Sequence, residues 1–443
     1  MDAILERAHQ LKQDLIDFVM DAEGDIAQAL ESYAAIQARR GSGDNVQRDM
    51  IIDGFITEGK VGDKAPLDIF LQDNELPQAD IDLLRKWRRS FIGLFTISEI
   101  FPDGFELTNW LTEKRYIVKP DNPRMLQDLS RCKVGEILLS RISPVTDTYW
   151  SFSGPCTVMG KLGKPKLAVA IGNFKDNHRN HLYSDAPDLL EEAWLSVEKY
   201  HSLFVDFFGS DEVTMPGYQL NKKMTEFQEI LTQKQLEQAG VDTSKSLTEM
   251  AQSAGVDEEE IKAAATELGA DSDVVSKLFD AKSTTGKMVA PKVELPAELK
   301  KAEQVTAISD PRWGQMLLPT YAKMKSILTA DDWQSIEGAE KLVRFYLEDK
   351  TINALIWRRL AKEYPAQLEK VLQAILQRPE FKLERDLDSL IESNHKLLEP
   401  ELPEIASVPL HLHNLFQEAM TEVNKSKPKG KNQKPVAKKG FSM

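Results

Sequence analysis

Cysteine is scarce in this sequence, which has only Cys132 and Cys156 among its 443 residues. Two cysteines are too few for a disulfide framework, although they leave room for one bridge, and this usage is typical of a reducing compartment. No basic segment followed by an apolar run is visible near Met1, so we expect no signal peptide. No stretch approaches the run of about eighteen apolar residues that indicates a membrane-spanning helix. These absences predict a cytoplasmic protein.

The common catalytic signatures are also missing. The sequence has no Gly-x-x-x-x-Gly-Lys-Ser/Thr phosphate loop, no Gly-x-Gly-x-x-Gly after a strand, no Gly-x-Ser-x-Gly elbow and no His-Glu-x-x-His zinc motif. Neither cysteine has a histidine beside it in the sequence. Carboxylates are abundant, but helical proteins scatter them over solvated faces, so their number identifies no acid–base pair. A non-enzymatic role is therefore favoured over catalysis, and no cofactor is expected.

The net charge of −14 is unevenly spread along the chain. The last nineteen residues hold seven lysines and no acid, so the preceding residues carry −21. An acidic body repels nucleic acid and anionic lipid at long range, which argues against specific DNA binding. The tail predicts disorder and could contact RNA, a ribosome or an anionic membrane surface, or fold back on the acidic body. Its candidate contact residues are Lys425, Lys427, Lys429, Lys431, Lys434, Lys438 and Lys439.

Hydrophobic periodicity predicts a mainly helical chain. Apolar residues recur at helical spacing over 4–18 and 190–208, and the whole of 297–398 has a helical pattern. Between these regions the period changes, and short β-rich segments are joined by tight turns over 92–100, 105–110, 115–118, 135–142 and 148–152. This spacing indicates a small barrel of the SH3 or OB kind. The predicted fold class is mainly α with a small β-barrel of about five strands inserted between helical regions, a multi-domain α+β chain.

The predicted domains follow from these patterns. They are a helical region (1–90), the barrel (91–160), a helical region (161–240), an acidic three-helix module (241–282), a linker (283–296), a C-terminal helical domain (297–424) and the disordered lysine-rich tail (425–443). The three-helix module has helix-turn-helix spacing and is similar to the small helical module at the start of bacterial translation initiation factor two. Its second helix opens with four acids, which would repel DNA phosphates, so protein docking is favoured there.

The predicted barrel carries the candidate contact residues. Small barrels often bind oligonucleotides or peptides across one face. The basic and aromatic candidates for such a face are Lys114, Arg115, Arg131, Lys133, Arg141 and Tyr149. Trp150 and Phe152 share one side of an alternating strand, which is typical of core, whereas Tyr149 points the other way.

A metal site is only weakly indicated. His178 and His181 form a His-x-x-His pair, but a zinc site needs three or four converging ligands, and the pair falls in a polar segment without cysteine. His201 lies on an apolar stripe and fits a satisfied core residue better than a ligand. A metal-dependent hydrolase is therefore the least favoured interpretation.

Three segments, 149–155, 164–172 and 310–316, resemble an uncharacterised family of cyanobacterial proteins. The resemblance implies a bacterial cytoplasm shared with thylakoid membranes, and it identifies no activity and no functional residue. We expect a scaffold or adaptor that binds another protein or complex. The alternative is an RNA- or ribosome-associated factor that uses the barrel and the tail.

Overall fold

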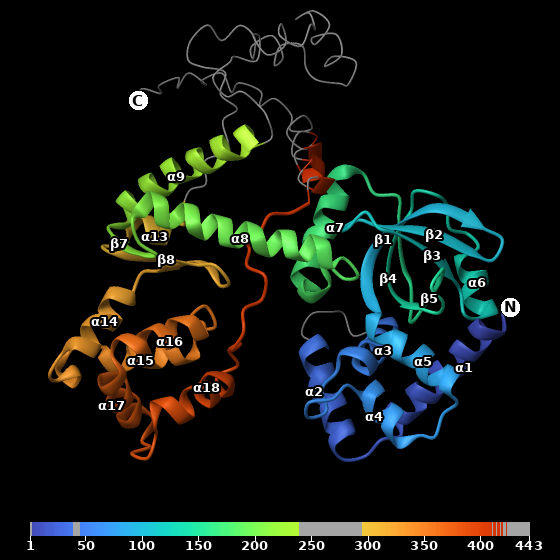
Figure 1. Cartoon of the computed structure of the whole chain (residues 1–443), viewed down its shortest axis with the longest axis horizontal. Helices are drawn as coiled ribbons and strands as arrows, with labels where there is room; N and C mark the ends of the chain where they lie inside the picture. Colours follow the sequence, from blue (N-terminus) through green and yellow to red (C-terminus); the bar gives the residue numbers. More distant parts are fainter. Residues whose placement is uncertain are drawn as a thin grey trace, which may run out of the picture. The chain divides into compact units, whose positions relative to one another are not determined.

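The computed structural model describes residues 2–38, 45–238 and 295–409 and part of the segment 411–422 (Figure 1). The predicted three-helix module, almost all of the linker and the lysine-rich tail, with all of its candidate contacts, lie outside the described residues. The chain divides into two compact units: unit 1 comprises 1–193 and 407–443, and unit 2 comprises 194–406. The boundary falls inside helix α8 (Pro187–Phe208), so it coincides with none of the domain limits expected from the sequence.

The N-terminal part of unit 1 is helical because its apolar residues recur every three to four positions. In α1 (Ala3–Met20) the side chains of Leu11 and Leu15 are fully buried, and Asp2 caps the helix by accepting a hydrogen bond from the Ile4 amide at 3.0 Å. The next elements are α2 (Asp25–Ala38), α3 (Asn45–Glu58), α4 (Pro66–Asp73), α5 (Gln78–Lys86) and the 3₁₀ turn η1 (Trp87–Arg89). Apart from α2, which contributes partly buried side chains, these elements bury residues in one shared core.

A closed barrel follows, and all of the strand segments expected from the sequence are confirmed. The strands are β1 (Phe91–Phe101), β2 (Gly104–Asn109), β3 (Arg115–Lys119), β4 (Ile137–Pro144) and β5 (Trp150–Phe152). They are ordered β1-β2-β3-β5-β4, and a β1–β4 pairing closes the barrel. The parallel β3–β5 pair, with α6 (Pro123–Leu129) between β3 and β4 in the chain, favours the OB kind of Greek-key barrel over the SH3 kind. An additional strand that was not expected, β6 (Thr157–Gly160), pairs with the edge of β4 that faces away from β1.

Strand β1 has buried side chains on both of its faces. Phe91 and Phe95 face the barrel core, where Trp150 and Phe152 are also buried, as their alternation predicted. The intervening Ile92 packs outward against α7 (Lys164–Asn177) in a separate cluster. In Figure 1 α7 and helices α1–α5 lie at different sides of the barrel, so helices cover two regions of its outer surface.

Unit 2 places a small sheet between two layers of helices. Its elements after α8 are β7 (Glu212–Met215), α9 (Gly217–Gln238), α13 (Ala297–Lys301), β8 (Val305–Asp310), β9 (Gly314–Leu318), α14 (Tyr321–Thr329), η3 (Trp333–Ser335), α15 (Ala339–Glu348), α16 (Ala354–Glu363), α17 (Pro365–Leu376) and α18 (Leu383–Ser393). The antiparallel sheet has the order β7-β8-β9. Val305 packs toward α8 and α9, whereas Ile308 packs toward the helices from α14 to α18. Figure 1 shows the sheet between these two layers.

The expectation that residues 297–398 are entirely helical is therefore wrong. Strands β8 and β9 occupy part of this range. The residues of β8 from Val305 to Ser309 are all buried, so the strand lacks the alternation of apolar and polar residues that reveals a half-exposed strand. None of the helices in the described ranges is long and apolar enough to cross a membrane.

Candidate functional site

Unit 1 contains a buried ion cluster where the helices meet the barrel. We use this name for Lys12 of α1, Asp53 and Glu58 of α3, Arg141 of β4 and His181, which lies in the 3₁₀ turn η2 (Arg179–His181). The Asp53 carboxylate pairs with the Lys12 ammonium and, at 3.3 Å, with Nε of Arg141. The Glu58 carboxylate pairs with Nη1 of Arg141 and, at 3.1 Å, with Nε2 of His181. Two cations and two carboxylates therefore neutralise one another.

Local backbone geometry makes this cluster possible. A Cβ atom on Gly154 would lie 2.8 Å from an Asp53 carboxylate oxygen, and one on Gly54 would lie 2.8 Å from the Tyr33 hydroxyl. Ser153, the neighbour of Gly154, donates its hydroxyl to Asp53 at 2.7 Å. Only glycine lets these chain segments approach the carboxylate and the phenol so closely.

The cluster also shifts the pKa values of its member Glu58 and of the neighbouring Tyr33. Burial alone would raise the pKa of Glu58, but His181 and Arg141 outweigh this effect and lower the pKa to about 2. Burial, with the neighbouring Glu58 carboxylate, raises the pKa of Tyr33 to about 12. Each charge is stabilised by a partner inside the cluster, so the arrangement holds the helices on the barrel and presents no free acid or base.

Several candidate contacts predicted from the sequence are engaged inside unit 1. Arg141 has a side chain only 7% exposed and belongs to the buried ion cluster. Tyr149 is also buried, and its hydroxyl donates to Asp2 at 2.5 Å while Lys119 lies 4.6 Å above its ring. Arg141 and Tyr149 are therefore engaged within unit 1, because N-terminal helices cover this side of β4 and β5, and their role as partner contacts stays a prediction.

Two further predicted cations have carboxylate partners on the barrel surface. Lys114 donates to the Asp185 carbonyl at 2.6 Å and pairs with Asp188 at 3.2 Å. Arg115 has a side chain 72% exposed and lies 3.6 Å from the Glu106 carboxylate. Acids therefore alternate with bases on this face, which weakens it as a surface for a polyanion.

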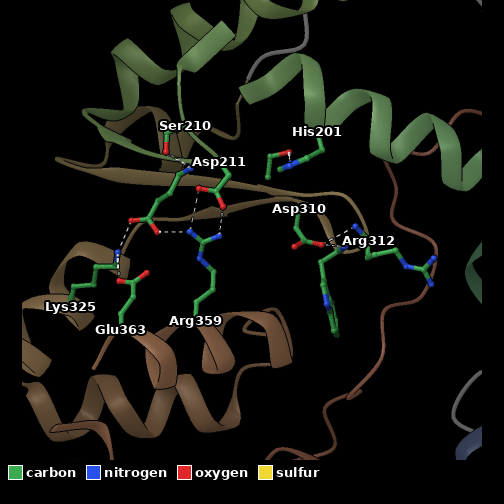
Figure 2. A network of polar contacts seen from close by, with 11 residues as sticks. His201, Ser210, Asp211, Asp310, Arg312, Lys325, Arg359 and Glu363 are labelled. Carbon is green, nitrogen blue, oxygen red and sulfur yellow. Dashed lines mark hydrogen bonds and ion pairs between the residues drawn. The ribbon is translucent and has the colours of Figure 1, made fainter. Parts of the chain in front are cut away.

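Unit 2 contains a second network of charges (Figure 2). Arg359 of α16 pairs with Asp211 at 2.7 Å and with Glu212 at 3.2 Å. Lys325 of α14 pairs with Glu212 at 2.7 Å and with Glu363 at 2.8 Å. Burial alone would lower the pKa of Arg359, but the Asp211 and Glu212 carboxylates raise it by more, so the net shift of the pKa is upward. The alternating charges connect β7 to two helices of the same unit.

A serine, a histidine and an aspartate meet beside this network and invite comparison with a catalytic triad. Nδ1 of His201 lies 3.3 Å from Oγ of Ser309, and the Ser309 amide donates to the Asp211 carbonyl. Ser309 is 0% exposed, however, so no substrate could reach its hydroxyl, and the Asp211 carboxylate is engaged by Arg359. The arrangement therefore fits a satisfied histidine, as the sequence indicated.

Figure 2 also shows Asp310 and Arg312, which lie in the tight turn between β8 and β9. The Asp310 carboxylate accepts hydrogen bonds from the amides of Arg312 and Trp313, both at 2.8 Å. The Arg312 guanidinium stacks 4.2 Å from the centre of the Trp194 ring. These contacts fix the hairpin and its exposed arginine.

The structure does not assemble a metal site from the predicted histidines. His178 caps α7 and packs on the ring of Phe174, while His181 binds Glu58 and Ser184. No group of three or more histidine, cysteine or acidic side chains converges within the described part of the chain. The two cysteines are free thiols at the barrel core, and burial raises the pKa of Cys156 to about 12.

One exposed surface on the barrel carries cations that are not paired with carboxylates of the described residues. The β6 patch consists of Lys133, Val134, Val158, Met159 and Lys161, all exposed. Val158 is 45% exposed and Met159 39%, although both lie in a strand. Neither Lys133 nor Lys161 forms an ion pair with a residue that the structure describes. Two of the predicted contacts fall here, because Lys133 belongs to the patch and Arg131, which is exposed and has no ion-pair partner in the described part of the chain, lies two residues before it.

The β6 patch is held together by a close approach of two chain segments. Gly135 has a φ of +85°, and a Cβ atom built on it would lie 3.6 Å from Cε of Lys161. The turn before β4 and the end of β6 therefore lie side by side. Glu136 contributes one acid here, and its carboxylate accepts a hydrogen bond from the Lys133 amide at 3.0 Å. With Arg131 included, the local charge is still positive on a chain that is negative overall.

Sequence reasoning missed Val134, Val158, Met159 and Lys161 because β6 itself was not expected. The succession of Val158, Met159, Gly160 and Lys161 offers only a weak strand signal. A comparison of the chain with protein-family models, curated proteins and solved structures gives no match. The functional argument therefore rests on the geometry of the described residues.

Proposed function

We propose that this chain is a non-enzymatic interaction protein that docks a partner protein with an acidic contact surface at the β6 patch. The observation that carries the proposal is the contrast among its cations. Arg141, Arg359 and Lys325 are committed to internal carboxylates, whereas Lys133 and Lys161 have no ion-pair partner among the described residues and lie beside exposed apolar side chains. Contiguous exposed apolar side chains rimmed by charge are a recognised mark of interaction sites.

The internal charge clusters support a scaffold role over catalysis. A general base or nucleophile must reach its substrate, and in the described residues the strongest candidates are neutralised or buried. Glu58 is held as an anion by His181 and Arg141, and Ser309 is completely buried. These groups fit the rigid support that a docking surface requires.

A protein partner fits the β6 patch better than RNA. Oligonucleotide binding without base readout relies on aromatic side chains that stack on bases, whereas the apolar side chains of the β6 patch are Val134, Val158 and Met159, and none of these is aromatic. The net charge of −14 also opposes the approach of a long polyanion. Apolar contacts with a rim of lysines instead suit a short acidic protein segment.

The test compares three full-length baits in quantitative capture experiments. The patch variant reverses two charges, Lys133→Glu and Lys161→Glu, and the matched control reverses two exposed arginines elsewhere on unit 1, Arg85→Glu and Arg115→Glu. Thermal unfolding first establishes that all three are folded. We expect an acidic protein that is recovered with the wild-type chain and the control and is lost with the patch variant.

Two results would reject the proposal. One is an identical set of captured proteins for all three baits. The other is loss of every patch-dependent partner after ribonuclease treatment, because RNA would then be the direct ligand and the alternative expected from the sequence would stand.

A further inference from the structure

We propose that the partner binds at the β6 patch by strand addition: an extended acidic segment pairs with the open edge of β6 and continues the barrel sheet. This inference rests on the proposed function and specifies its binding mode. Among the described strands, β6 stands at the end of the sheet order and pairs only with β4, so its other side has no strand neighbour. Extended peptides commonly bind proteins by pairing with such an edge.

The strand register shows which backbone groups lie at the open edge. On the β1 side of β4 the Ile97 amide donates to the Glu136 carbonyl at 3.0 Å. Hydrogen-bonding direction alternates along an antiparallel strand, so Leu138 is also directed toward β1. The next residue, Leu139, is directed to the opposite side, where its register partner is Thr157 of β6. The Ser153 amide donates to the Arg141 carbonyl on this same side, two residues farther along β4, as the alternation requires.

Val158 therefore presents its backbone outward. Thr157 is directed toward β4, so the N–H and C=O groups of Val158 are directed away from β4 and toward the open edge. A register shift between Ile137 and Leu138 places Met159 in a bulge, which interrupts the regular ladder beyond Val158. One residue, Val158, thus offers the central donor and acceptor for an incoming strand.

The chemistry of the incoming segment follows from the flanking side chains. Lys161 follows β6, and Lys133 lies in the turn before β4 at this same end of β6, so carboxylates at one end of the added segment would meet both ammonium groups. Val158 and Met159 offer exposed apolar contacts along β6 beside these lysines. A short segment that alternates apolar and acidic residues satisfies both requirements. The competing interpretation is that the lysines only protect a sheet edge from self-pairing.

The probe for the test is a synthetic peptide of alternating valine and glutamate with a fluorescent label, and its binding is followed by anisotropy. The control peptide has proline in place of the central valine, so it keeps the charge and loses a backbone donor. The variants are Val158→Pro, which removes the outward N–H, and Val158→Thr, which keeps it. We expect the wild-type chain and Val158→Thr to bind the peptide. Val158→Pro and the control peptide should each weaken binding by about tenfold, the effect of losing one backbone hydrogen bond and its geometry.

A second measurement uses the unaltered protein, so it does not depend on whether the proline variant folds. Amide hydrogen exchange should slow in residues 157–160 when the peptide binds, and it should stay unchanged in β2, on the opposite flank of the barrel. Equal binding by Val158→Pro, or unchanged exchange in β6 despite binding, would overturn strand addition and leave docking through side chains. Absence of peptide binding would also overturn it and favour edge protection. The capture experiment decides the proposed function independently of both results.

Discussion

Replacing Arg141 by methionine is the sharpest test of how unit 1 is held together. The substitution keeps much of the apolar volume and removes a group that contacts both the buried Asp53 carboxylate and the Glu58 carboxylate, whose side chain is 30% exposed. Removing one partner of a buried ion pair costs about 3–5 kcal/mol, because the remaining charge stays buried without compensation. Here Asp53 keeps Lys12 and Glu58 keeps His181, so we expect the lower end of that range.

The stability of unit 1 can be measured by urea unfolding with pulsed hydrogen exchange, which reads the barrel segments separately from unit 2. We expect Arg141→Met to lower the free energy of unfolding of unit 1 by about 3 kcal/mol. The control is Arg115→Met on the same barrel, where an exposed pair at 3.6 Å should contribute at most about 0.5 kcal/mol.

A double variant distinguishes loss of a charge partner from loss of packing. If Glu58→Gln is added to Arg141→Met, one uncompensated carboxylate disappears, so the combined cost should be smaller than the sum of the two single costs. Costs that add fully, or an Arg141→Met variant as stable as Arg115→Met, would refute the idea that charge neutralisation holds the helices on the barrel.

The remaining predictions concern acidity, unit 2 and the thiols. Because the pKa of Glu58 falls from 4.5 to about 2 on folding, its contribution is complete above the unfolded pKa and is lost as the pH falls through about 2; solvent screening of this 30% exposed side chain keeps the contribution below about 3 kcal/mol. Glu58→Gln should therefore flatten the acid limb of a plot of unfolding free energy against pH. Arg359→Gln leaves Asp211 and Glu212 without their shared cation, and should destabilise unit 2 by about 1–3 kcal/mol while unit 1 is unchanged in the same exchange assay. The pKa of Cys156 is raised to about 12, so a colorimetric disulfide reagent at pH 8 should react with it far more slowly in the folded chain than in urea; equal rates would contradict its burial.

Local patterns were sufficient for much of unit 1. The apolar spacing of α1 and of α8 predicted helices, and the alternation of Trp150 and Phe152 predicted both a strand and its buried side. Turn residues such as Pro102 and Gly104 separated β1 from β2. These signals lie within a few residues of one another, which is why a single sequence contains them.

The sheet of unit 2 lacked such signals. Strand β8 is buried on both faces, so its composition resembles that of a buried helix of the same length. Its partner β7 lies 92 residues away at the Thr214–Thr306 pair, and no local pattern connects them. Asp310 followed by Pro311 was a usable turn signal, because the Asp310 carboxylate does hold the hairpin.

The candidate contacts on the barrel show why a basic residue in a strand is an ambiguous signal. Alternation correctly places Arg141 on the outer side of β4, since Leu138 and Ile142 occupy the barrel core. The sequence pattern cannot show that helices cover this outer position, or that α3 supplies both carboxylates that bind Arg141. Lys133 has the same charge and lies just before the same strand, yet it is exposed and forms no ion pair with any residue that the structure describes.

What separates these two cations is therefore the coverage of each outer strand position by other elements. Lys12 and Asp53 meet across 41 residues of sequence, and Ser153 lies 100 residues beyond Asp53, so the pairing of Arg141 depends on long-range packing. A docking surface requires the reverse, an outward strand position that no other element of the chain covers. Strand β6 meets that condition beside a strand whose other outer positions are covered. For this reason Lys133 and Lys161 of the β6 patch, rather than the lysines and arginines elsewhere on the barrel, are the residues to test first.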